Sequence, residues 1–90
     1  MRKEAFKWFR KAAEQGQDTA QDELALKYAN GQGVIQDYVQ AHKWWNIAGA
    51  SGNKNAIRNR GIVAKKMTAK QLAKAQELAA EWMEKHLSRP

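Results

Sequence analysis

The strongest constraint on this chain is an internal repeat that relates residues 5–20 to a segment 36 positions later. The residues that recur are Ala5 as Ala41, Lys7 as Lys43, Trp8 as Trp44, Ala12 as Ala48, Gly16 as Gly52, and Ala20 as Ala56. A period in this range is typical of helix pairs that stack, because one pair alone cannot bury its apolar face. The chain is therefore predicted to fold as a short array of stacked helices.

Apolar residues recur at spacings of three and four within five segments, which is the pattern of amphipathic helices. The predicted helices cover residues 3–15, about 18–30, the segment between Asp37 and Gly52, about 54–66, and about 69–87. Each apolar stripe is too narrow for a stable isolated helix, so the helices must pack on one another. An all-α fold of about five helices follows.

Capping residues and glycines mark the ends of these helices. Capping boxes are predicted at Asp18 with Gln21, Asp37 with Gln40, and Thr68 with Gln71, and Asn53 is a further predicted cap. The Gly31-Gln32-Gly33 segment ends the second helix and permits a tight turn.

Composition limits the chain to one domain with few functional classes. It has 90 residues, no cysteine and a formal net charge of +7. The absence of cysteine excludes disulfides and thiolate chemistry. No apolar run approaches 18 residues, so membrane insertion is not expected. The N-terminus has no apolar signal core, so the chain as written is expected to be cytoplasmic, while a longer exported parent chain stays open.

The central unit resembles the Sel1-like repeat, a relative of the tetratricopeptide repeat. The residues that carry the resemblance are Ala20, Leu24, Tyr28, Gly31, Gly33, Val34, Asp37, Ala41, Trp44, Ala48 and Gly52. Ala25 and Gly49 depart from the family pattern but are also small. The resemblance implies a right-handed α-α superhelix, which is a tetratricopeptide-like solenoid.

The resemblance divides residues 1–90, as one Sel1-like repeat domain, into four units. These are a partial repeat with only its second helix (1–16), a complete repeat (17–52), a degenerate partial repeat (53–66), and a capping helix with its tail (67–90). The third unit is degenerate because Arg60 replaces the usual leucine and Ala64 the usual tyrosine.

A protein-protein interaction scaffold is the function that the resemblance implies, with a protein or peptide partner and no catalysis. In such relatives the first helix of each pair lines the concave face. Transferred to this chain, the implied partner-binding residues are Asp22, Glu23, Leu26, Asn30, Asn55, Arg58, Asn59, Ile62, Lys65 and Lys66. This face is expected to be acidic at one end and basic at the other, with Arg58 and Asn59 able to hold a carboxylate or peptide amides.

The first helix is expected to lack part of its cover, because the chain begins inside a repeat. Phe6, Trp8 and Phe9 are the residues concerned. Two outcomes stay open: a homodimer that hides this open N-terminal helix, or adequate wrapping by the remaining helices.

Aromatic and histidine side chains are given structural interpretations. The four tryptophans and Tyr28 are expected to pack in the core and not to stack on bases, with Trp45 the least certain. His42 and His86 are expected to be partly exposed helix residues. No cofactor, metal or catalytic residue is predicted.

Two other functions remain as alternatives. The charge permits electrostatic binding of nucleic acid or an acidic surface through Lys65, Lys66, Lys70 and Lys74, although nucleic acid is the less favoured partner. The second alternative is that the chain is a truncated accessory fragment without a partner of its own.

Overall fold

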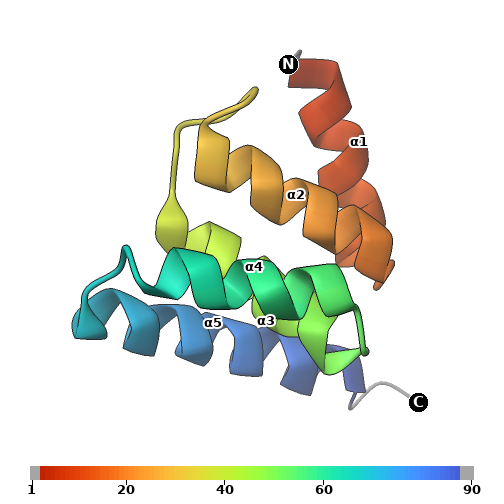
Figure 1. Cartoon of the computed structure of the whole chain (residues 1–90). Helices are drawn as coiled ribbons and strands as arrows, with labels where there is room; N and C mark the ends of the chain where they lie inside the picture. Colours follow the sequence, from red (N-terminus) through yellow and green to blue (C-terminus); the bar gives the residue numbers. More distant parts are fainter. Residues whose placement is uncertain (1–2, 88–90) are drawn as a thin grey trace.

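The computed structural model describes residues 3–87, and these residues form five helices and no strand. The helices are α1 (Lys3–Glu14), α2 (Asp18–Asn30), α3 (Tyr38–Ala50), α4 (Lys54–Ala64) and α5 (Ala69–Leu87) (Figure 1). The predicted all-α fold is confirmed. The tail after Leu87, which was predicted to follow the capping helix, lies outside the described residues.

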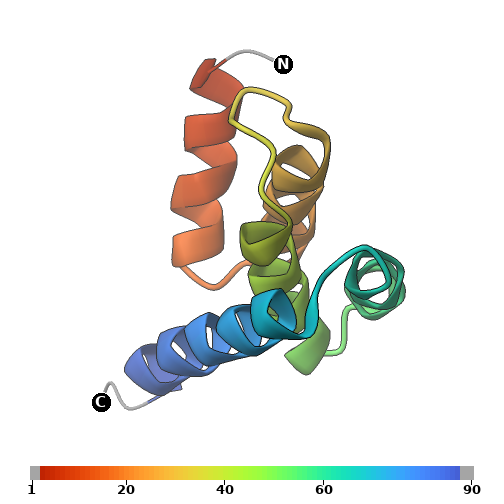
Figure 2. The same cartoon turned by 90° about the vertical axis from the view of Figure 1, so that its left-hand side faces the viewer.

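The helices are arranged in two layers around α3. α2 packs on α1 and α3, while α4 and α5 both pack on α3. Figure 2 shows α2 and α4 on one side of the molecule and α1 and α5 on the other. α2 and α4 run in the same direction (Figure 1), as the first helices of successive repeats do in an α-α solenoid.

Most of the predicted helix caps are confirmed. Gln71 N donates to Thr68 Oγ1 at 3.1 Å, and Thr68 N donates to Gln71 Oε1 at 2.9 Å, which completes the capping box of α5. Asn53 Oδ1 accepts from a backbone N–H of α4 at 2.9 Å. The box predicted at Asp37 and Gln40 forms only in part: Asp37 Oδ1 accepts from Gln40 N at 3.1 Å, but the Asp37 N–H donates to a backbone carbonyl of α2 at 2.9 Å and not to the Gln40 side chain.

The capping box predicted at Asp18 and Gln21 is wrong. α2 begins at Asp18, and its N-cap residue Gln17 makes no side-chain cap bond. Gln21 is buried instead, and its Nε2 donates to Ala13 O of α1 at 3.1 Å. Asp18 Oδ2 accepts from Asn53 Nδ2 at 3.1 Å. Tertiary partners have therefore taken both side chains away from local capping.

The core is centred on Trp44, which is 2% exposed. The Trp82 ring meets the Trp44 ring edge to face, with 5.7 Å between centroids. Small residues let the helix axes approach: a Cβ at Gly49 would lie 3.1 Å from Ile57 Cγ1 of α4. The other members of the buried core are Phe6, Ala13, Ala20, Leu24, Ala25, Ala41, Trp45, Ile47, Ala48, Ala56, Val63 and Ala79.

Two expectations about burial are wrong. His42 is only 4% exposed, because α3 is packed on several sides, and its Nδ1 has no hydrogen-bond partner among the described residues. Trp8 was expected in the core with the other tryptophans but is 73% exposed, because no helix within residues 3–87 covers its face of α1. This agrees with the open face expected on α1, although Phe6 of the same helix is buried. Trp45, the least certain of the tryptophans, is buried at 3% exposure.

Candidate functional site

A groove of about 310 Å³ lies between α2 and α4. Its lining comes from these two helices, the connection that precedes α3, and α3 itself: Leu26, Ala29, Asn30, Gln36, Tyr38, Trp45, Asn59, Ile62, Val63 and Lys66. The groove exists because α2 and α4 both pack on α3 but contact each other only narrowly. Residues from their C-terminal halves therefore face each other across a gap.

The floor of the groove is apolar and held in place. Trp45 is buried below the groove, and its Nε1 donates to Asp22 Oδ1 at 2.8 Å. This bond fixes the indole ring and occupies one carboxylate oxygen of Asp22. Leu26 and Ile62 stand above the floor on opposite helices, and each leaves a large part of its side chain exposed. These side chains give an otherwise largely polar groove one apolar stretch, which can contact an apolar side chain.

The polar groups along the groove are mostly unpaired. The side chains of Asn30, Asn59 and Lys66 make no hydrogen bond or ion pair with other residues in the described range 3–87. Gln36 differs, because its Nε2 donates to Ala29 O at 2.9 Å and holds the connecting segment against α2. The two amides and the ammonium group remain available to a ligand.

Among the residues predicted from the sequence to bind a partner, the structure brings Leu26, Asn30, Asn59, Ile62 and Lys66 together in the groove. Asp22 lies behind Trp45. Glu23 Oε2 pairs with Lys27 Nζ at 3.5 Å, and the same ammonium lies over the Phe9 ring. Glu23 is therefore part of a structural contact between α2 and α1.

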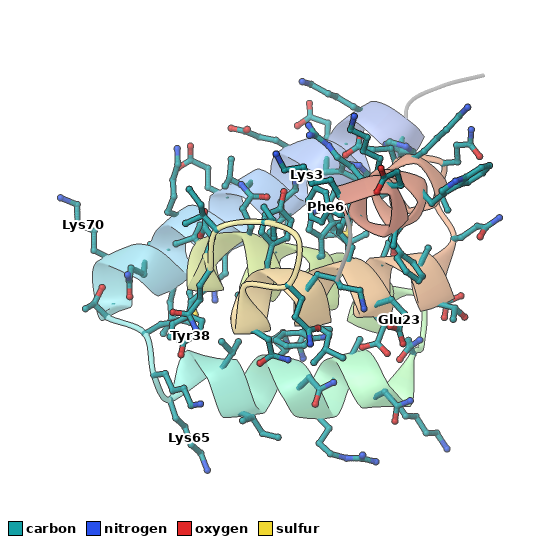
Figure 3. All side chains as sticks on the ribbon, turned by 90° about the horizontal axis from the view of Figure 1, so that it is seen from above. Lys3, Phe6, Glu23, Tyr38, Lys65 and Lys70 are labelled. Atoms are coloured by element: carbon teal, nitrogen blue, oxygen red, sulfur yellow. The ribbon has the colours of Figure 1, made fainter. Side chains whose placement is uncertain are left out.

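The other predicted residues of α4 lie outside the groove. Asn55, Arg58 and Lys65 are exposed, and none of them belongs to the lining. Figure 3 places Lys65 and Tyr38 toward one end of the α2–α4 pair and Glu23 toward the other. Among the lining residues of the groove only Lys66 carries a charge.

Several lining residues were missed from the sequence. Gln36 and Tyr38 come from the connection and from the first residue of α3, which the transferred repeat positions do not include. Trp45 was assigned only to packing, yet it forms the floor. The signal for Trp45 was its place beside the repeat-core position of Trp44, which puts an aromatic ring on the next face of the same helix.

A second hollow, of about 330 Å³, is lined by side chains that hold α5 against other helices. Its lining consists of Glu14, Lys43, Leu78, Glu81, Trp82, Lys85 and His86. The His86 ring stacks on Trp82 with 3.5 Å between centroids, and His86 Nε2 lies 2.6 Å from Glu14 O. His86 thereby connects the C-terminal end of α5 to the end of α1, and its expected partial exposure is confirmed.

Other classes of site have little support in the described residues. Within residues 3–87 no three histidine, aspartate or glutamate side chains gather where they could hold a metal ion. None of the helices in that range combines the length and apolar character needed to cross a membrane.

Comparisons with known proteins agree with this architecture. The family model described as Sel1 repeat matches residues 2–17 and 19–53. Among solved structures, the chain is similar to a protective antigen present in uropathogenic Escherichia coli strains and displaying an SLR fold, with 44% identity over 94% of this chain and a TM-score of 0.91. This chain spans 18% of that protein's length. No curated protein sequence matches the chain significantly.

The matched segments together cover more than half of the chain, and the structural neighbour covers nearly all of it. The tetratricopeptide-like solenoid that the resemblance implied is confirmed by that neighbour. The chain belongs to the Sel1 repeat family.

Proposed function

We propose that this chain is a protein-interaction module whose α2–α4 groove binds an extended peptide segment of a partner protein. Proteins built from Sel1 repeats generally act as interaction scaffolds, and their solenoid fold is typically non-catalytic.

The observation that carries the proposal is the pair of unpaired amides, Asn30 and Asn59, beside an apolar floor. An asparagine amide offers a donor and an acceptor, which matches the N–H and C=O groups of an extended backbone. Trp45 and Ile62 would receive one apolar side chain between them. A volume of about 310 Å³ suits such a short contact.

Lys66 makes the two ends of the groove electrostatically different, because it is the one charged residue in the lining. Its ammonium group lies at the C-terminal end of α4, where no carboxylate of the described chain pairs with it. A peptide with an apolar residue followed by an acidic side chain or a terminal carboxylate would satisfy both the floor and this charge.

The test is selection of peptides from a random display library on the intact chain, followed by affinity measurement of the enriched sequences. Asn59→Ala and Ile62→Ser should each weaken binding by about tenfold, since both remove contacts near the centre of the groove. Arg58→Ala and Ile35→Ser are matched controls, because both residues are exposed outside the lining. Enriched peptides that bind all four variants equally would place the binding elsewhere.

Electrostatic binding of nucleic acid or an acidic surface is the second candidate. The net charge is +7, and Lys65, Lys66, Lys70 and Lys74 are all exposed. Lys74 is partly compensated by Glu77, with 3.6 Å between Nζ and Oε1. If this candidate is right, binding of duplex DNA should fall steeply as salt is added. Replacement of the four lysines by glutamate should abolish that binding. Binding that survives both changes would count against it.

A further inference from the structure

The outer face of α1 carries an uncovered tryptophan within a ring of charged side chains. Trp8 is 73% exposed and lines a shallow hollow of about 300 Å³ with Glu4, Lys7 and Lys11. A tryptophan exposed to this degree loses the free energy that burial of its large apolar surface would supply. The face is therefore suited to contact with something outside residues 3–87.

The repeat itself shows what covers a tryptophan at this position. Trp44, 36 positions after Trp8, is 2% exposed because α5 crosses α3 there. The covering helix supplies Trp82, whose ring meets Trp44 edge to face. Lys43 Nζ lies 4.5 Å from the centroid of the Trp44 ring. On α3, the tryptophan at this repeat position is thus covered by an amphipathic helix that carries an aromatic anchor.

The charged side chains around Trp8 indicate which kind of helix could bind there. Lys7 is the repeat equivalent of Lys43, whose surroundings hold two carboxylates, those of Glu14 and Glu81, as well as two cations, Arg10 and Lys85. Around Trp8 the hollow holds two lysines and only Glu4. A covering helix would need carboxylates at its rim to pair with these lysines.

We propose that the Trp8 face of α1 docks an acidic amphipathic helix of a partner protein, which buries an aromatic side chain against Trp8 and pairs carboxylates with Lys7 and Lys11. This surface is separate from the α2–α4 groove, with which it shares no lining residue. One chain could therefore hold a helix and an extended peptide at the same time.

The test uses two fluorescein-labelled synthetic helices of about 18 residues, long enough to be partly helical alone. Both carry one tryptophan and leucines on one face; the first has glutamates along the rim and the second has lysines. Fluorescence anisotropy with the full chain should show binding of the glutamate probe, weakened by added salt, and at least tenfold weaker binding of the lysine probe.

Variants locate the contact. Trp8→Ala should weaken binding of the glutamate probe by about tenfold, as truncation of a central aromatic anchor does. Lys7→Glu with Lys11→Glu should weaken it similarly and reduce its salt dependence. The matched controls are Ile35→Ala, which removes another highly exposed apolar side chain, and Lys54→Glu with Lys70→Glu, which makes the same charge change elsewhere. Ile62→Ser in the groove should leave binding unchanged.

Three results of the binding assay would overturn the proposal: no binding of the glutamate probe, equal binding of both probes, or unchanged binding by Trp8→Ala. Light scattering of the chain alone decides the competing occupant. A dimer that forms at the assay concentration and is lost in Trp8→Ala would assign the face to a second copy and remove the acidic helix from it.

Discussion

At the scale of single residues, the helices packed on α3 lower the pKa of a buried histidine on that helix. His42 lies on α3 with almost no exposure. Its pKa is lowered from the ordinary value of 6.5, first by desolvation and then by the positive charge of Arg60 on α4. Arg60 is steadied by Asn46, with 3.4 Å between Nη1 and Oδ1. The fold therefore favours the neutral imidazole.

Lowering the pH from 7 to 5 is expected to reduce the free energy of unfolding through His42. The unfolded chain takes up the proton near pH 6.5, before the folded chain does, so stability falls as the pH falls through this value. His42→Gln should flatten the dependence, and Trp8→Ala should retain it. Urea unfolding followed by circular dichroism at both pH values measures the effect. An identical pH dependence in His42→Gln would show that another group is responsible.

At the scale of helices, two glycines inside α3 and α4 have opposite environments. Gly49 faces α4 so closely that a Cβ would lie 3.1 Å from Ile57 Cγ1. Gly61 has no atom within 4 Å of the position that a Cβ would take. Neither has a positive φ. The first glycine allows close helix packing, whereas the second only lowers helix propensity.

Gly61→Ala is therefore expected to increase the free energy of unfolding by about 0.5–1 kcal/mol, the usual difference between the two residues inside a helix. Gly49→Leu should decrease it by about 1–3 kcal/mol, because the side chain would force α3 and α4 apart. Urea unfolding curves of the two variants and the parent chain measure both effects. A Gly61→Ala variant no more stable than the parent would contradict the open environment of that position.

At the scale of the whole molecule, α3 is the helix on which the others depend. It packs with α2, α4 and α5, whereas α1 packs mainly with α2. The tryptophans Trp8 and Trp44 occupy equivalent repeat positions on α1 and α3, yet they differ from 73% to 2% exposure. The same residue type therefore has a surface role at one end of the array and a core role at its centre.

This difference predicts unequal costs for the same substitution. Trp44→Ala should lower the free energy of unfolding by about 3–5 kcal/mol, because it leaves a cavity under α5. Trp8→Ala should change it by less than about 0.5 kcal/mol, as exposed substitutions do. Thermal unfolding followed by circular dichroism compares them. Comparable losses in both variants would mean that Trp8 is covered in solution.

The sequence alone determined the helices and much of the groove. Helix ends depend on residues within one turn of one another. The cap at Asn53 and the capping box of Thr68 with Gln71 could therefore be predicted without knowledge of the tertiary structure. Such local signals need no knowledge of distant neighbours. The family resemblance, through its transferred repeat positions, also named Leu26 and Ile62, and both line the groove.

Only the tertiary structure decided which side chains are covered and which line the groove. Trp8 and Trp44 have the same place in the repeat, and their burial differs because α5 crosses one and no described helix covers the other. His42 is buried, and Tyr38 lines the groove, because helices from other parts of the chain pack on α3. Burial and groove lining depend on segments distant in the sequence, and local pattern does not specify how those segments are placed.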